Sequence, residues 1–140
     1  MTAIVLDHEE IEPSSCNFQQ SAVDETVMMG FCGYQIFKVD AVNFSAYLSI
    51  LSFASQLRDI ADSFKGDETI ARLCDLDDVP WELQFSREGE TVTIVEAPKA
   101  NPPKTARVSL SELHTASHAY FDRVWQECCK LFPPLADAKR

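Results

Sequence analysis

Two histidines and an aspartate near the C-terminus have the spacing of metal ligands on a helix. His114, His118 and Asp122 follow one another at intervals of four residues, so on a helix they would lie along one side. The pattern is not H-E-x-x-H, and a complete site would need further ligands from elsewhere in the chain. His114 also falls on the apolar face of the expected helix, where a packed imidazole is commoner than a ligand. The sequence therefore predicts no metal site and no cofactor.

Cysteine and histidine side chains offer a second kind of chemistry, nucleophilic catalysis. No local signature marks a nucleophile, and Cys32 and Cys128 occupy positions expected to be buried, where a thiol is usually unreactive. The cysteines are odd in number and lack C-x-x-C spacing, which indicates reduced thiols and not a disulfide framework or a zinc site. The residues considered were the three histidines His8, His114 and His118 and the five cysteines Cys16, Cys32, Cys74, Cys128 and Cys129.

The motifs of calcium and nucleotide binding are missing. The acidic run of Asp75, Asp77 and Asp78 lacks the glycine and the final glutamate of an EF-hand loop. There is no P-loop, G-x-G-x-x-G or G-x-S-x-G motif, and four glycines in 140 residues leave little material for a phosphate cradle. We therefore predict no catalytic residues and a protein that is not an enzyme.

Acidic residues near an aromatic side chain are the predicted binding residues. Trp81 could anchor a partner in a desolvated pocket while the carboxylates around it steer a basic protein. The alternative is that Trp81 opens a strand and faces the core, as tryptophan commonly does. A second acidic run lies near the N-terminus. The full set is Asp75, Asp77, Asp78, Trp81 and Glu82, with Glu9, Glu10 and Glu12.

The charge of the chain restricts its partners. Twelve basic and twenty-two acidic residues give a net charge of −10, and residues 1–98 alone contain 5 basic and 18 acidic side chains. Binding to nucleic acid or to anionic lipid requires Lys and Arg to neutralise phosphate, so neither partner is expected. A basic protein is the favoured partner. The alternative is that the charge serves solubility alone.

The length and hydropathy of the chain indicate one domain in the cytoplasm. A chain of 140 residues with 46% hydrophobic residues has the size and composition of a single globular core. The most apolar stretch, residues 46–54, is too short to span a bilayer and contains Ser49 and Ser52. The N-terminus has no basic region followed by an apolar run, so no secretion signal is predicted.

Hydrophobic periodicity predicts an α+β fold, with a single mixed or antiparallel sheet packed against two main helices. Expected strands are residues 3–6, 31–39, 81–85, 91–96 and 107–108, with Gly89 in the hairpin turn. Both faces of the strand at 31–39 are expected to be largely buried. The helices are expected at 44–64, between Asn43 and Gly66, and at 110–132, capped by Ser109. Residues 68–74 suit a helical turn, 1–26 an irregular or edge segment and 133–140 a flexible tail.

This order of elements resembles the small acidic immunity proteins of bacterial toxin–immunity systems. The resemblance covers most of residues 27–132 as a pattern of elements, and it assigns no site residue. It implies a cytosolic inhibitor that occludes a basic cognate toxin. One alternative is a small-molecule-binding or enzymatic domain, with a pocket between sheet and helix formed by Tyr34, Tyr47, Ser49 and His114. Another is an acidic mimic of nucleic acid.

Overall fold

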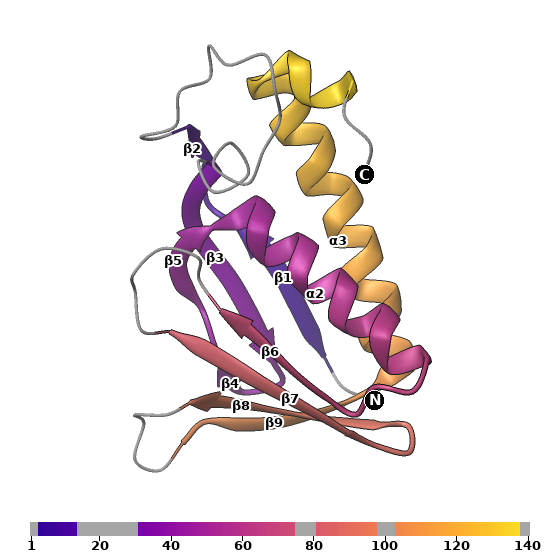
Figure 1. Ribbon diagram of the computed structural model, residues 1–140. Helices are drawn as coiled ribbons and strands as arrows, with labels where there is room; N and C mark the ends of the chain where they lie inside the picture. The colour runs from indigo at the N-terminus through magenta and orange to yellow at the C-terminus, as the bar shows by residue number, and fades with distance from the viewer. Residues whose placement is uncertain (1–2, 14–30, 75–80, 98–102, 138–140) are drawn as a thin grey trace.

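The computed structural model describes residues 3–13, 31–74, 81–97 and 103–137. In this part the protein is an α+β structure in which two long helices lie side by side against antiparallel strands (Figure 1). The fold class is therefore as predicted. The strands, however, form two sheets and not one.

The first sheet is built around one central strand, β3. β3 (Phe31–Val39) pairs antiparallel with β1 (Ile4–His8) along one edge, in a register that sets Leu6 opposite Phe37. It also pairs with three shorter strands, β2 (Glu12–Pro13), β4 (Val42–Asn43) and β5 (Ala46–Ser49). Gly33, Gln35 and Phe37 of β3 point towards the helices and are part of the interior, as the alternation of a strand requires.

The second sheet is a meander of four strands that follow one another in the chain. Its order is β6 (Ile70–Cys74), β7 (Glu82–Glu88), β8 (Thr91–Ala97) and β9 (Thr105–Ser109), all antiparallel. The predicted hairpin is confirmed, and its turn is tighter than expected because only Gly89 and Glu90 connect the paired residues Glu88 and Thr91. Gly89 has a φ of 60°, a conformation that glycine adopts without steric cost.

The first helix starts later than its apolar periodicity predicts. α2 runs from Ile50 to Lys65, and Ser49, not Asn43, is its N-cap and accepts a hydrogen bond from the amide of Ser52. Asn43 lies in β4, and residues 46–49 pair with β3, so that strand pairing replaces the predicted first turns. Gly66 ends the helix, as predicted.

The C-terminal elements agree with the sequence except at two places. α3 spans Leu110–Leu131, and Ser109 caps it by accepting a hydrogen bond from the amide of Glu112, as predicted. Residues 70–74 form β6 and not a helical turn, because they pair in register with β7. Pro133–Asp137 forms a 3₁₀ helix in the segment predicted as a tail, and it buries Leu135 completely.

A single hydrophobic core joins both sheets to both helices. It contains Phe37 of the first sheet, Phe85 and Ile94 of the second, Leu57 of α2 and Val124 of α3. The other face of β3 is only partly buried: Cys32 is buried and Ile36 is half-buried, but Tyr34 and Lys38 are exposed. In the described ranges, α2 and α3 lie against the opposite face of the first sheet.

Two findings concern membranes and disulfides. No helix in the described ranges has the length and apolar character needed to cross a membrane. None of the four cysteines that the structure describes forms a disulfide, and the adjacent pair Cys128 and Cys129 is not bonded to each other, as their positions on a helix predict.

Candidate functional site

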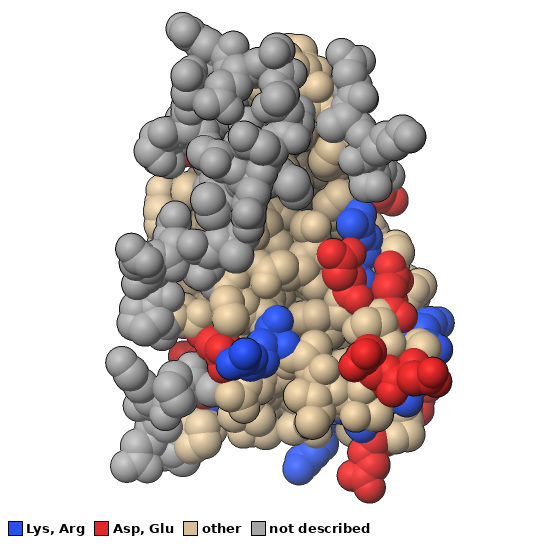
Figure 2. Space-filling view, viewed as in Figure 1, with Lys and Arg blue, Asp and Glu red and all other residues tan. Residues whose placement is uncertain are grey.

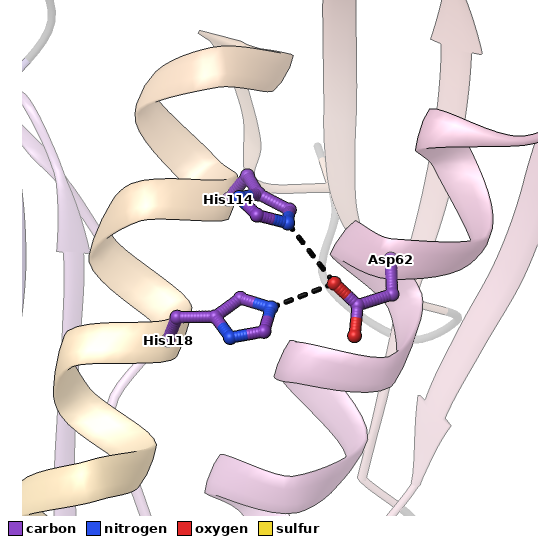
Figure 3. A group of neighbouring side chains, drawn as sticks. All are labelled: Asp62, His114 and His118. Atoms are coloured by element: carbon purple, nitrogen blue, oxygen red, sulfur yellow. Dashed lines mark hydrogen bonds and ion pairs between the residues drawn. The ribbon is translucent and has the colours of Figure 1, made fainter.

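The candidate site is a cluster of one aspartate and two histidines between the two helices. Asp62 of α2 faces His114 and His118 of α3, and both imidazoles point at the same carboxylate oxygen (Figure 3). The Nε2 atom of His118 lies 2.6 Å from Asp62 Oδ1, and that of His114 lies 3.0 Å from it. A carboxylate oxygen can only accept a hydrogen bond, so each Nε2 atom carries a proton and donates a hydrogen bond to Asp62.

Helix packing brings these three side chains together. His114 and His118 are one turn apart on α3, and their ring centroids are separated by 4.4 Å. Beside them, the buried residues Leu113, Ser117 and Phe121 of α3 pack into the core that also holds Ala61 and Phe64 of α2. The site therefore lies at the solvent-facing margin of a rigid helix pair.

The site is negative and open to water. Partial burial raises the pKa of Asp62, but hydrogen bonding and charge from His118, together with His114, outweigh it and leave that pKa lowered. The side chains of His114, His118 and Asp62 are 30%, 41% and 48% exposed, so an ion can reach them. Figure 2 shows acidic side chains over the C-terminal part of α2, with basic side chains interspersed among them.

Asp122, the third member of the predicted helical series, does not join this cluster. It is exposed on α3, and Asp62 from the other helix stands in its place. Asp62 could not be found from spacing alone, because 52 residues separate it from His114 and only the packing of α2 on α3 brings it near. The one available signal was that both residues lie beside apolar positions of amphipathic helices.

The third histidine belongs to a buried polar network. His8 Nδ1 lies 2.9 Å from the hydroxyl of Tyr120, and His8 Nε2 lies 2.8 Å from Glu127 Oε2. The Tyr120 hydroxyl also donates to Gln35 Oε1 at 3.0 Å, and burial raises the pKa of Tyr120. Burial likewise raises the pKa of Cys128. In the described ranges, His8 is thus bound to oxygen atoms and not to a thiol.

The predicted binding residues near Trp81 are only partly described. Asp75, Asp77 and Asp78 lie outside the described residues. Trp81 is half-buried and packs against the core, with its ring centroid 6.4 Å from that of Phe53. Glu82 accepts hydrogen bonds from Gln84 and Cys74 and lies 3.5 Å from Arg72, so other side chains already occupy its carboxylate.

The N-terminal acidic residues lie beside an exposed aromatic pair. Glu9, Glu10 and Glu12 are exposed, and the amide of Glu9 donates to the carbonyl of Tyr34. Tyr34 and Tyr47 are direct partners across β3 and β5, and their exposed fractions are 38% and 57%. We call Tyr34, Tyr47, Glu9 and Glu12 the tyrosine face; sequence reasoning missed it because it expected residue 47 in a helix.

The pocket proposed from the sequence is not assembled. Tyr34 and Tyr47 lie on the face of β3 that the helices leave open, Ser49 caps α2, and His114 faces Asp62. Two neighbouring grooves of about 420 and 300 Å³ do lie between β1 and α3, and neither has these residues in its lining. Their lining residues include Ile4, Leu6, Ala116 and Arg123. Arg123, which lines the smaller groove, donates a hydrogen bond to Asp7.

Comparisons with known proteins give no relative. No family model matches the chain, and neither a curated protein nor a solved structure matches it. Function must therefore be argued from the geometry alone.

Proposed function

We propose that the protein acts in the cytoplasm by binding a basic protein partner and blocking its activity, in the manner of an immunity protein, with the tyrosine face as its binding surface. The observation that supports this proposal is the exposed pair Tyr34 and Tyr47, next to Glu9 and Glu12 on the sheet face opposite α2 and α3.

The two tyrosines have the properties of an interface anchor. Residues directly opposite each other on antiparallel strands have Cβ atoms about 5 Å apart, so Tyr34 and Tyr47 form one aromatic surface. Tyrosine is enriched at protein interfaces because it buries a large apolar ring at a small cost in conformational entropy and keeps a hydroxyl for hydrogen bonding. Both rings sit on a paired sheet, which orients them before a partner arrives.

Carboxylates next to this pair give the surface its preference for a basic partner. Glu12 stands opposite Cys32 on the strand that also bears Tyr34, and therefore on the same face. Burial, the charge of Cys32 and the charge of Glu12, in that order, raise the pKa of Tyr47, which places Glu12 within electrostatic reach of the ring. Lys38 is the basic residue further along the same face.

The charge of the whole chain supports the same partner. A net charge of −10 attracts a basic protein at long range and speeds its encounter, while like charge repels acidic competitors. Short-range anchors then determine how long the complex lasts. In the proposed complex, the carboxylates speed association and the tyrosines slow dissociation.

A kinetic binding experiment tests the proposal. Its probe is the protein encoded by the gene next to the gene for this chain. We expect Tyr34→Ala with Tyr47→Ala to raise the dissociation rate at least about tenfold, as loss of a central anchor does. Glu9→Gln with Glu12→Gln should instead lower the association rate and flatten its dependence on NaCl. Surface plasmon resonance at several NaCl concentrations measures both rates.

Matched variants decide where the partner binds. Asp67→Asn with Glu68→Gln removes two exposed charges from the connection after α2. It should leave the dissociation rate unchanged and lower the association rate less than Glu9→Gln with Glu12→Gln does. If Asp77→Asn with Asp78→Asn slows association while the tyrosine variants bind normally, the partner contacts the segment before Trp81 and the tyrosine face is wrong. Absence of binding at micromolar concentrations, together with unimpaired activity of the probe protein, contradicts the inhibitor function itself.

A further inference from the structure

We propose that Asp62, His114 and His118 form a zinc-binding site that links α2 to α3. The site is independent of the tyrosine face, which lies on the other side of the first sheet. It is built from two imidazole nitrogens and one carboxylate oxygen, a donor set that Zn²⁺ accepts in sites with one position left for water.

The distances between the three donors already suit a small divalent ion. Zinc bonds of 2.0 to 2.2 Å in tetrahedral geometry place neighbouring ligand atoms about 3.3 Å apart. The two Nε2 atoms lie 2.6 and 3.0 Å from Asp62 Oδ1, and all three donor atoms lie within 4.8 Å of one another. Widening these two separations by about 0.7 and 0.3 Å, through movement of the exposed and rotatable carboxylate, would admit the ion.

The orientation of the side chains supports the same conclusion. Both imidazoles turn their Nε2 atoms inward to one point between the helices, and Asp62 reaches that point from the opposite side (Figure 3). Two protons now point at a single oxygen. One zinc ion would replace both contacts, with the proton of each ring moved to Nδ1, which leaves Nε2 free to coordinate.

The electrostatic surroundings favour a cation. Asp59 precedes Asp62 by one turn of α2 and is exposed, and Figure 2 shows acidic side chains over this part of the helix. Arg58 lies over the Phe121 ring, 3.9 Å from its centroid, and forms an ion pair with Asp59. Because Arg58 offsets the charge of Asp59, the carboxylate of Asp62 itself is the charge that attracts a divalent ion.

Cobalt titration followed by absorption spectroscopy tests the site, because Co²⁺ takes the same ligands and reports their identity. We expect one Co²⁺ per chain with visible ligand-field bands and without the intense near-ultraviolet band of cobalt–thiolate bonds. This distinction matters because the free cysteines also bind soft metals. Zn²⁺ should displace the Co²⁺, because both ions take the same ligands.

Single substitutions identify the ligands. His118→Ala and Asp62→Asn should each weaken Zn²⁺ binding at least about tenfold, since each removes a ligand or its charge. Asn has the shape and the hydrogen-bonding oxygen of Asp, so we expect the Asp62→Asn variant to keep the fold of the parent. Asp122→Asn removes a neighbouring exposed carboxylate of α3 and should bind Zn²⁺ as the parent does.

Thermal unfolding gives a second readout. Because the ion would join two helices only in the folded state, Zn²⁺ should raise the melting temperature of the parent and of Asp122→Asn but not of Asp62→Asn. The proposal is overturned if the parent does not bind Co²⁺ or Zn²⁺, if thiolate bands accompany binding, or if the affinity of Asp62→Asn and His118→Ala equals that of the parent.

Discussion

At the scale of single residues, the hydroxyl of Tyr120 joins α3 to the first sheet. It donates to Gln35 Oε1, and the side-chain amide of Gln35 donates to the carbonyls of Asp7 and Ile36. Gln35 is 1% exposed and Tyr120 is 4% exposed, so water cannot replace these bonds. A buried polar group without a hydrogen-bond partner destabilises the folded state. We therefore expect this small network to contribute to the stability of the fold.

We expect Tyr120→Phe to lower the free energy of unfolding by about 1–3 kcal/mol, because Gln35 Oε1 loses its donor in a buried place. Urea unfolding followed by circular dichroism measures the change. Tyr34→Phe removes the same hydroxyl from an exposed ring and should change stability by less than about 0.5 kcal/mol. Equal effects of the two substitutions would show that the Tyr120 hydroxyl contributes nothing specific.

The free energies of unfolding of the parent and of Tyr120→Phe should change differently at alkaline pH. Burial raises the pKa of Tyr120 above the ordinary value of 10.0, so in the unfolded chain the phenol ionises first. Above pH 10 the folded state then holds one more proton than the unfolded state, and stability falls as pH rises. The parent should lose about 1.4 kcal/mol per pH unit more than Tyr120→Phe in this range, and below pH 10 their difference should stay constant.

Single residues also mark how far the sequence could predict the candidate site. The helical spacing of His114 and His118 was visible in the sequence, and their position on one side of α3 follows from it. The part that Asp62 plays in the cluster was not visible in the sequence, because it depends on the packing of two helices that lie far apart in the chain. For Trp81 the sequence left two interpretations open, an interface anchor or a core residue; its ring is half-buried and lies beside Phe53.

At the scale of elements, the close contact of β3 with the first turn of α2 depends on one glycine. A Cβ atom at Gly33 would lie 2.6 Å from Ile50 Cδ1 and 3.0 Å from the carbonyl oxygen of Glu10. Ile50 is fully buried and the Glu10 oxygen belongs to the backbone, so neither yields easily. Gly33 thus allows the helix, the strand and the segment before β2 to approach one another.

We expect Gly33→Ala to lower the free energy of unfolding by about 1–3 kcal/mol, the usual cost of an added methyl group in a packed interior. Gly66→Ala is the control for the added methyl group, since its Cβ atom would meet nothing closer than 3.4 Å. That substitution should lower the free energy of unfolding less than Gly33→Ala does, because it forces no packed atom to move. Chemical denaturation of both variants decides the matter, and a neutral Gly33→Ala would mean that the strand and helix can move apart.

The elements themselves were predictable where local signals dominate. Ser109 before an apolar run fixes the start of α3, and Gly89 fixes the hairpin turn. The predicted start of α2 was wrong. Residues 44–49 have helical periodicity, but this segment pairs with β3, and no local signal reveals that contact. β6 was missed for the same reason, since it becomes a strand through its pairing with β7.

At the scale of the whole molecule, α2 and α3 connect the two sheets. The side chain of Gln56 on α2 bonds both the amide and the carbonyl of Cys74 at the end of β6. The turn between β7 and β8 bonds the start of α3, where the carbonyl of Glu90 accepts from the amide of Leu110. Core residues from both sheets belong to one cluster. In the described ranges, the two sheets are therefore separate as backbone ladders and continuous in packing.

This shared core predicts that the two sheets unfold together. Trp81 lies where the second sheet meets α2, and Trp125 lies on α3, 5.8 Å from Phe121 between ring centroids. Single-tryptophan variants, Trp125→Phe and Trp81→Phe, thus report on different parts of the molecule. Within each variant we expect fluorescence and far-ultraviolet circular dichroism to give the same urea midpoint, because small domains with one core unfold in a single step. If the Trp81 signal changes at lower urea than the circular dichroism of the same variant, the second sheet detaches first and the chain contains two units of stability.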